Sequence, residues 1–236
     1  MSSSIIQRLQ QIDWNEISEN LANYGHALTP VLLTPQECAN LIHSYDDNSN
    51  FRSQVIMARF GFGKGEYKYF KYPLPKLVAD LRGQLYPRLA VLANSWAPHI
   101  GGGMYPTKYS EFLDRCHSEG QSKPTPLLLR YEAGDFNCLH QDLYGELAFP
   151  FQLTFFLSRK EVDYSGGEFV LVEQRPRMQS HAVVIPGEQG QAVIFPTRYR
   201  LVHGKRGAYK TSLRHGVSPV RQGKRFTLGV IFHDAK

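Results

Sequence analysis

Apolar residues in the first half of the chain recur near helical spacing. Between residues 5 and 21 they predict a helical segment with one buried face. A second helix is expected after Thr34, because this threonine, the following proline and Glu37 have the pattern of a capping box. A third stripe lies between residues 77 and 96, with Pro87 as a candidate kink. The two apolar stripes comprise Ile5, Ile6, Leu9, Ile12, Ile17 and Leu21, and then Leu77, Leu81, Leu85, Leu89, Leu92 and Trp96.

From about Thr125 the pattern changes to short β-rich runs between turn residues. Runs of this kind predict a sandwich or jelly roll rather than βαβ units. Before them, the glycine-broken segment RFGFGKGEYKYFKY (59–72) predicts a hairpin. No linker separates the two halves, so we predict one α+β domain over residues 1–236 with a mainly β core. Residues 1–124 are expected to give helical support and the hairpin, and residues 125–236 the jelly roll. The runs are PLLLRYEAG, FPFQLTFFL, GGEFVLVEQ, HAVVIPG, QAVIFPT, RHGVSPV and RFTLGVIFH.

Composition narrows the class of protein. A hydrophobic content of 42% and a charged content of 20% are those of an ordinary globular protein. The three cysteines are scattered without CxxC spacing, which argues against a disulfide framework and against a zinc site. The N-terminus lacks the pattern of a signal peptide, and no apolar run approaches membrane-spanning length. We therefore expect a cytoplasmic protein without membrane contact.

The stretch NCLHQDLYG (137–145) carries the first candidate chemistry. His140 and Asp142 lie two positions apart, so in an extended segment they would face the same side. Two histidines and one carboxylate on one face of the metal are the ligands of non-haem Fe(II) oxygenases. The pair alone is weak, because a surface turn can carry the same residues. It predicts a metal site only if a distant histidine supplies a third ligand.

Two downstream histidines, His203 and His215, are candidates for the third ligand. After His215 the strand RFTLGVIFH places Arg225 and Thr227 on one face, one strand away from this histidine. A buried arginine needs an anion, and its guanidinium can bind a carboxylate through two hydrogen bonds, with the threonine hydroxyl as a further donor. The distal carboxylate of 2-oxoglutarate is such an anion. No comparable strand follows His203, so His215 is preferred and His203 stays as the alternative.

These segments together resemble a known group of enzymes. RYEAGDFNCLHQD, GGEF, QAVIFPT and RHGVSPVRQGKRFTLGVIFHD are similar to the Fe(II)/2-oxoglutarate-dependent dioxygenases, closest to their prolyl-hydroxylase-like branch. More narrowly, HQDLYGE, GGEFVLVEQRPRMQS and LRHGVS with GVIFHDA resemble a bacterial family of such oxygenases. That family has been proposed to act oxidatively on damaged, alkylated nucleic acid. The resemblance covers residues 125–236 strongly and the first half more loosely.

The resemblance implies a double-stranded β-helix, that is, a jelly roll, with Fe(II), 2-oxoglutarate and O2 as cofactor and cosubstrates. It also implies oxidative decarboxylation of 2-oxoglutarate to succinate, coupled to hydroxylation or oxidative demethylation of a prime substrate. The chain departs from the family pattern in one respect, because a long stretch, residues 198–214, comes before His215. This departure keeps His203 as an alternative third ligand. The residues that match the family's positions are His140, Asp142 and His215 for the metal, and Arg225, Thr227 and Tyr131 for 2-oxoglutarate.

The charge pattern bears on the prime substrate. The formal net charge is +6, and residues 189–233 contain nine Lys or Arg and no Asp or Glu. This stretch could form a phosphate-contacting rim, with aromatic side chains from residues 60–72 stacking on bases of single-stranded or damaged nucleic acid. A solvated charged face and ordinary packing would give the same pattern. The candidate substrate contacts are Arg198, Lys205, Arg206, Tyr67 and Tyr69.

Two other functions stay open at this point. The same surface would suit an acidic peptide, and the prolyl-hydroxylase-like signature favours a protein side chain as substrate. Salt-sensitive binding to oligonucleotides would separate these two enzymes. A non-enzymatic jelly-roll binding module is a remote third alternative, which a metal titration would test.

Overall fold

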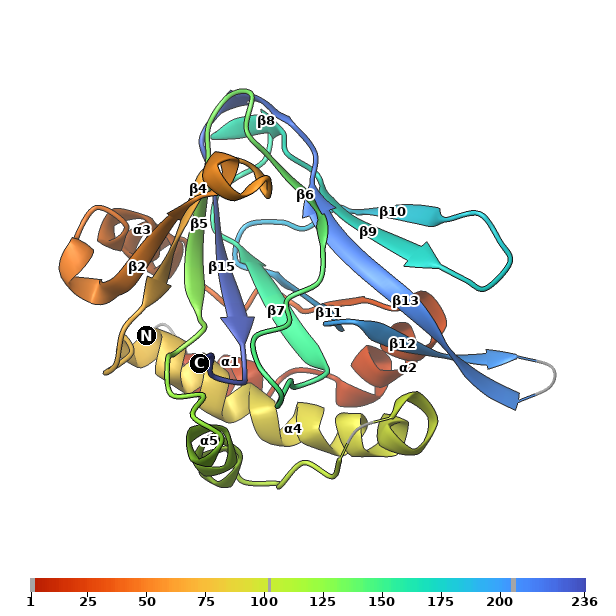
Figure 1. The fold of residues 1–236 in the computed structure, drawn as a ribbon. Helices are drawn as coiled ribbons and strands as arrows, with labels where there is room; N and C mark the ends of the chain where they lie inside the picture. The colour runs from red at the N-terminus through yellow and green to blue at the C-terminus, as the bar shows by residue number, and fades with distance from the viewer. Residues whose placement is uncertain (1–2, 102, 205–206) are drawn as a thin grey trace.

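A computed structural model describes residues 3–101, 103–204 and 207–236. Its centre consists of two antiparallel sheets that face each other, and most of the helices lie on one side of them (Figure 1). The major sheet has seven strands in the order β1-β11-β7-β15-β5-β4-β2. These strands are β1 (Ala27–Leu28), β11 (Ala192–Pro196), β7 (Phe151–Phe156), β15 (Arg225–Ile231), β5 (Leu127–Tyr131), β4 (Glu66–Phe70) and β2 (Phe51–Ile56).

The minor sheet has the order β10-β9-β13-β6-β3, and β12 extends it by pairing with β13. A separate two-stranded ribbon joins β8 to β14. This arrangement is the predicted α+β fold with a mainly β jelly roll. The strands of the minor sheet and the ribbon are β10 (His181–Ile185), β9 (Phe169–Gln174), β13 (Gly207–Val217), β6 (Phe136–His140), β3 (Gly63–Lys64), β12 (Tyr199–Gly204), β8 (Tyr164–Gly166) and β14 (Val220–Gly223).

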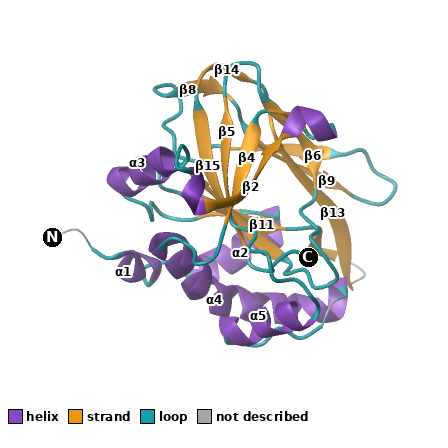
Figure 2. Ribbon diagram, turned by 60° about the vertical axis from the view of Figure 1, so that its left-hand side comes forward, coloured by secondary structure: helices purple, strands orange, loops and turns teal. Residues whose placement is uncertain are grey.

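Most of the helices lie on the outer side of the major sheet, and α2 and α4 also contact β12 of the minor sheet (Figure 2). The longest, α4, places Leu81, Leu85 and Leu89 in one core with residues of β7 and β15. None of the described helices has both the length and the apolar character needed to cross a bilayer. The helices are α1 (Ile5–Leu9), α2 (Trp14–Tyr24), α3 (Pro35–Ser44), α4 (Lys76–Ile100) and α5 (Tyr109–Ser118), with short 3-10 turns η1 (Asn48–Asn50) and η2 (Met57–Phe60).

Capping decides where the predicted helices begin and end. The capping box at Thr34 is present, with the threonine hydroxyl accepting from the Glu37 amide and the Glu37 carboxylate accepting from the Thr34 amide. The apolar stripe over residues 5–21, in contrast, is divided between two helices, because Asp13 caps a new helix with its side chain. Helix α4 continues through Pro87. Helix α5 was missed by the sequence analysis.

The first half of the chain contributes more than helical support. Strands β1, β2 and β4 belong to the major sheet, and β3 pairs with β6 in the minor sheet. The predicted hairpin over residues 59–72 is therefore wrong in its pairing: β4 pairs with β2 and β5, whereas β3 belongs to the other sheet. Glycines at 61, 63 and 65, all with positive φ, let the chain pass from one sheet to the other.

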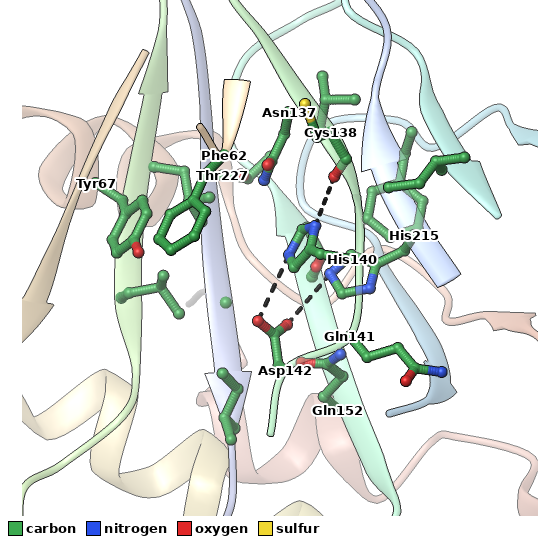
Figure 3. Close-up of a pocket in the computed structure, with 18 of the residues that line it drawn as sticks. Phe62, Tyr67, Asn137, Cys138, His140, Gln141, Asp142, Gln152, His215 and Thr227 are labelled. Atoms are coloured by element: carbon green, nitrogen blue, oxygen red, sulfur yellow. Dashed lines mark hydrogen bonds and ion pairs between the residues drawn. The ribbon is translucent and has the colours of Figure 1, made fainter. Parts of the chain in front are cut away.

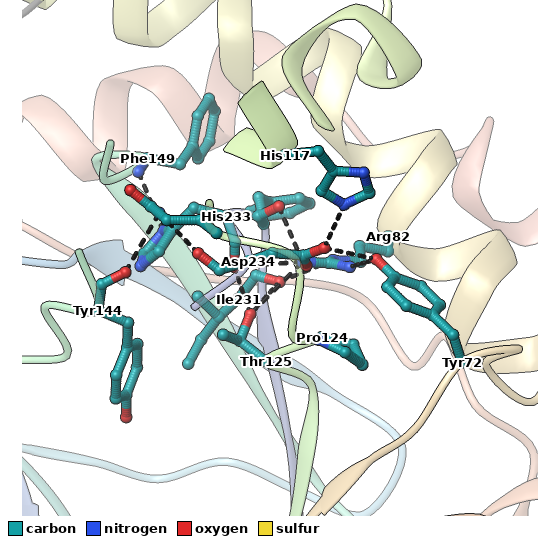
Figure 4. A network of polar contacts seen from close by, with 12 residues as sticks. Tyr72, Arg82, His117, Pro124, Thr125, Tyr144, Phe149, Ile231, His233 and Asp234 are labelled. Atoms are coloured by element: carbon teal, nitrogen blue, oxygen red, sulfur yellow. Dashed lines mark hydrogen bonds and ion pairs between the residues drawn. The ribbon is translucent and has the colours of Figure 1, made fainter. Parts of the chain in front are cut away.

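The C-terminal residues are anchored by a buried polar network (Figure 4). The Arg82 guanidinium on α4 donates to the Asp234 carboxylate at 2.7 Å and to backbone carbonyls of residues 231–233. Tyr72 and His117 also contact the Asp234 carboxylate, at 2.9 Å each. The Gln121 amide nitrogen donates to carbonyls of residues 144, 147 and 234, so the same network holds the 141–150 loop.

Next to this network, His233 is fully buried with a neutral ring. Its Nδ1 accepts a hydrogen bond from the Phe149 amide at 3.1 Å. Burial and the nearby charge of Arg82 lower the pKa of His233 to about 4, from an ordinary value of 6.5. In the unfolded chain this histidine regains its ordinary pKa, which links stability to pH.

We expect the free energy of unfolding to fall as the pH drops from about 6.5 to about 4. Above this pH window His233 is neutral in both the folded and the unfolded chain. Within the window the unfolded chain binds a proton at His233, whereas the folded chain does not. The loss at the lower end is on the order of 3 kcal/mol. Urea unfolding at several pH values measures it. His233→Gln keeps an acceptor for Phe149 but cannot titrate, so this variant should lose less stability; an equal loss would contradict the assignment.

Candidate metal centre

Three side chains, two from the motif NCLHQDLYG and one from β13, meet in the space between the two sheets (Figure 3). Possible ligand atoms of His140, Asp142 and His215 all lie within 4.8 Å of one another. The Asp142 carboxylate is 3.5 Å from His140 Nε2 and 3.2 Å from His215 Nε2. The centres of the two imidazole rings are 4.1 Å apart. Two imidazoles and one carboxylate around one point can bind a divalent metal on one face and leave other positions open.

Strand pairing brings these residues together. His140 is the last residue of β6 and lies directly opposite His215 in β13. The strand ends there, so Asp142 belongs to the following loop rather than to an extended strand. The loop is fixed by Gln141, whose amide donates to the Leu213 carbonyl at 2.7 Å. The convergence that the two-residue spacing predicted is therefore produced jointly by a strand end and an anchored loop.

Hydrogen bonds orient two of the three side chains. His140 Nδ1 is 2.8 Å from the Cys138 carbonyl, so Nδ1 carries the proton and Nε2 faces the site with a free lone pair. The Tyr144 hydroxyl donates to Asp142 Oδ1 at 2.8 Å, and the Tyr69 hydroxyl donates to Tyr144 at 3.0 Å. This chain of hydroxyls fixes one carboxylate oxygen and leaves the other for a ligand.

The protonation states suit a divalent metal. Burial by itself would raise the pKa of Asp142, but the charge of His215 and hydrogen bonds with both histidines hold that pKa well below its usual range. Burial, with repulsion from His140, lowers the pKa of His215. For His140, burial is outweighed by the hydrogen bond and charge of Asp142, which raise its pKa. At neutral pH the carboxylate is thus ionised and the His215 ring neutral, as metal ligands must be, whereas a proton held by His140 would have to leave when a metal binds.

The triad opens into a cavity of about 410 Å³ that also contains Arg225, Thr227 and Tyr131. Arg225 is only 1% exposed, yet its three guanidinium nitrogens have no hydrogen-bond partner within the described residues. Its guanidinium carbon lies 5.4 Å from the centre of the Tyr131 ring, and the Tyr131 hydroxyl accepts from Asn137 at 3.3 Å. A buried cation without a partner in the protein fits an anionic ligand of the cavity.

The position of Arg225 corrects one expectation. The sequence pattern placed Arg225 one strand away from His215, but β15 belongs to the major sheet and β13 to the minor sheet. The two residues therefore face the cavity from opposite walls. Their shared orientation toward the interior follows from alternation along each strand, whereas the sheet to which each strand belongs depends on long-range pairing.

His203 lies away from the triad. It is exposed on β12 and pairs with Ala208 of the neighbouring strand β13. From Ala208 to His215 the strand β13 extends about 23 Å, at about 3.3 Å per residue. The long stretch before His215 is thus an extension of two strands beyond the barrel, and the structure groups His215, not His203, with His140 and Asp142.

The candidate substrate contacts are scattered. Tyr67 lines the cavity, but Tyr69 is buried behind it and donates to Tyr144, which argues against stacking on a substrate. Arg198 is exposed above the Tyr199 ring and lines a neighbouring groove that shares Leu143 with the cavity. Lys205 and Arg206 lie outside the described residues.

The predicted basic rim is also partly neutralised. Arg200 is buried and paired with Glu173 at 3.0 Å. Arg221 and Lys224 lie 3.5 and 3.1 Å from glutamates. Arg198 and Lys210 both lie 4.6 Å from the centre of the Tyr199 ring. Among the described residues of the stretch, these two and the exposed Arg214 on β13 remain as candidates for contact with phosphate.

Sequence reasoning missed three polar residues of the site. Tyr144 orients Asp142 and Asn137 contacts Tyr131, and both stand inside the motif NCLHQDLYG. Their place in the motif was the only signal. Gln152 lines the cavity from β7, inside the apolar run FPFQLTFFL, where nothing in the sequence distinguishes it from a core residue.

Solved structures share this architecture. A prolyl hydroxylase from Trichoplax adhaerens, in complex with a peptide fragment of the hypoxia inducible factor oxygen degradation domain, superposes with a TM-score of 0.58 at 14% identity over 99% of this chain and 94% of that one. A 2OG-Fe(II) oxygenase family oxidoreductase from Burkholderia pseudomallei gives 0.55 at 15% identity, over 94% and 92%. Fold and triad together define the class of structure: the architecture of the 2OG-Fe(II) oxygenases, with a His-Asp-His set that could hold a metal ion.

Sequence comparison identifies the family. A family model described as "Oxygenase, catalysing oxidative methylation of damaged DNA" (Oxygenase-NA) matches residues 65–235. A protein described as uncharacterized in two strains of Mycobacterium tuberculosis is 45% identical over 167 residues, which are 70% of this chain and 72% of that protein. The chain therefore belongs to the Oxygenase-NA family of oxygenases.

Proposed function

We propose that this protein is an Fe(II)/2-oxoglutarate-dependent dioxygenase in which His140, Asp142 and His215 bind the metal. The observation that carries the proposal is that one cavity contains both the triad and the partnerless guanidinium of Arg225. The triad supplies the donor set of a non-haem iron site, and Arg225 supplies the counter-charge for a dicarboxylate. When bound, Fe(II) supplies the oxidising chemistry, with O2 as oxidant and 2-oxoglutarate as co-reductant.

The remaining residues of this end of the cavity suit the cosubstrate. The planar guanidinium of Arg225 can bind the distal carboxylate through two parallel hydrogen bonds. Thr227 lines the cavity from the same face of β15 as Arg225 and offers a hydroxyl. Tyr131 pairs with Arg225 across the two strands and offers a second hydroxyl. In this proposal the three side chains orient 2-oxoglutarate, with its other end toward the triad.

Replacing Arg225 tests the cosubstrate assignment. Arg225→Met removes a buried charge that has no hydrogen-bond partner among the residues the structure describes, so the ligand-free variant should unfold at no lower temperature than the wild type. Its affinity for 2-oxoglutarate should fall on the order of a hundredfold or more. Arg225→Lys keeps the charge but cannot make two parallel hydrogen bonds to a carboxylate. Its affinity for 2-oxoglutarate should therefore lie between those of the wild type and Arg225→Met. Thermal unfolding with and without 2-oxoglutarate, in the presence of Mn(II), measures both effects.

The outcomes are distinct. The wild type should gain thermal stability with rising 2-oxoglutarate concentration, and Arg225→Met should not. If Arg225→Met were stabilised by 2-oxoglutarate as strongly as the wild type, the dicarboxylate would bind elsewhere and this part of the proposal would fail. Arg159→Met is the matched control, because this exposed arginine pairs with Asp163 and does not line the cavity.

We further propose that the prime substrate is a methylated base in single-stranded or damaged nucleic acid. The family description names damaged DNA, and exposed Arg198, Lys210 and Arg214 offer contacts for phosphate. An oxygenase inserts one oxygen atom into a C–H bond of the methyl group, while the other oxygen atom enters succinate. The hydroxymethyl product then releases formaldehyde, and the nitrogen regains a hydrogen. Because the cavity lies between two sheets, the base must leave its stack to enter.

A further inference from the structure

The cavity is longer than its proposed cosubstrate requires. Arg225 lines one end and Ile231 the other, and β15 extends about 20 Å between them. A five-carbon dicarboxylate spans only about 5 Å between its terminal carbons, given bond lengths of about 1.5 Å. The end of the cavity beyond the triad is therefore left for another ligand.

That end contains a second buried polar group without a partner. Gln152 on β7 lies opposite Ile231 and is 3% exposed, and its amide nitrogen has no hydrogen-bond partner in the described part of the chain. Its side chain lies beside Asp142 in the cavity (Figure 3). Buried amide donors are nearly always hydrogen-bonded in folded proteins. The missing partner is thus expected to be a polar ligand.

The walls between this glutamine and solvent are aromatic and apolar. Phe62 and Tyr67 line the same cavity, and Figure 3 shows their rings side by side, across from the triad. Phe62 is 47% exposed, and the exposed Leu139 and Leu143 lie on the side that carries His140 and Asp142. Aromatic and apolar walls with one amide at the inner end favour a flat ring with a polar edge over an extended charged chain.

We propose that the part of the cavity beside the triad, between Gln152 and the rings of Phe62 and Tyr67, is a nucleobase subsite, in which the Gln152 carboxamide hydrogen-bonds the edge of the base and Phe62 and Tyr67 contact its face. The inference rests on the proposed function, and it names Gln152 as the residue that recognises the base. A carboxamide presents one donor and one acceptor side by side, which is complementary to the adjacent donor and acceptor on a base edge. Aromatic side chains stack on every base, so they add affinity without selecting sequence.

Binding without turnover tests the subsite. Under anaerobic conditions, with Mn(II) and 2-oxoglutarate present, calorimetry would measure the affinities of 1-methyladenosine and 3-methylcytidine monophosphates, their unmethylated parents, and ribose 5-phosphate. We expect the wild type to bind the base-bearing nucleotides, and Gln152→Met to bind them about ten- to a hundredfold more weakly. Ribose 5-phosphate should bind both proteins equally weakly. Because the Gln152 amide donates to no group in the described part of the chain, the variant is expected to fold.

A second pair of variants gives a test that does not depend on the buried position. Phe62→Ala should weaken nucleotide binding about tenfold. Phe60→Ala is its matched control, because Phe60 stacks on Phe62 with ring centres 5.5 Å apart and is 59% exposed but does not line the cavity. Gln36→Met, at an exposed position on α3, is the corresponding control for Gln152→Met.

Each outcome decides the inference. Equal nucleotide affinity in wild type and Gln152→Met, or no affinity in the wild type, would overturn the subsite, as would Gln152-dependent binding of a proline peptide instead of nucleotides. Gln152-dependent nucleotide binding without any formaldehyde release would support the subsite while the proposed reaction fails. Formaldehyde release that is unchanged in Gln152→Met would support the reaction while the subsite fails.

Discussion

Asp142→Ala is expected to abolish metal binding and 2-oxoglutarate turnover together. Asp142 is the only carboxylate of the triad, and its ionised form balances part of the metal's charge. Without it two histidines remain, and the loss should exceed the roughly 10- to 100-fold effect of changing an outer-shell partner. Equilibrium dialysis with Mn(II) and succinate formation without prime substrate measure the two effects.

Two comparisons make this result specific. Tyr144→Phe removes only the hydroxyl that orients Asp142, so it should show the smaller outer-shell effect. His215→Ala should behave like Asp142→Ala, whereas His203→Ala should bind metal like the wild type, because His203 is exposed on the β12–β13 hairpin. Loss of metal binding in His203→Ala with retention in His215→Ala would contradict the assignment of the third ligand.

The second large effect concerns stability. Asp234→Ala should lower the free energy of unfolding by about 3–5 kcal/mol, because it leaves the buried charge of Arg82 without its carboxylate. The same carboxylate accepts from Tyr72 and contacts His117, so those polar groups also lose a partner. Urea unfolding monitored by circular dichroism measures the change.

The matched control is Asp80→Ala. Asp80 pairs with Lys76 one helical turn away, and the lysine of this pair is largely exposed. Breaking such a surface pair costs about 0.3–0.5 kcal/mol. If Asp234→Ala were no more destabilising than Asp80→Ala, the network in Figure 4 would not anchor the C-terminal residues as described.

Local alternation predicted which side chains share a face, but not which strands are neighbours. Arg225 and Thr227 both line the cavity because strand residues two apart point the same way. The sequence also offered Tyr67 and Tyr69 together as candidate substrate contacts, and only the fold shows that Tyr69 lies behind the cavity, against Tyr144. The opposition of Arg225 and His215 across two sheets depends on pairing between segments far apart in sequence, which a local pattern does not encode.

Gln152 illustrates the other limit of sequence reasoning. A glutamine in an apolar strand usually indicates an edge or a satisfied core amide, and the sequence does not tell whether a partner exists. Only the three-dimensional arrangement leaves its amide nitrogen without one, inside the cavity of the triad. Capping residues, in contrast, were informative where they were strong: Thr34 predicted its helix correctly, whereas Asp13, which divides the first apolar stripe, was overlooked.

The central claim is tested most directly by measuring succinate and formaldehyde in one reaction. The purified protein would receive Fe(II), 2-oxoglutarate, O2 and a single-stranded oligonucleotide that carries one methylated base. We predict formaldehyde in equal amount to the substrate-dependent succinate, with both products lost in His215→Ala. Succinate without formaldehyde would contradict the demethylation of that base and point to a protein substrate. No succinate under any of these conditions would contradict the assignment of the protein as a 2-oxoglutarate-dependent dioxygenase.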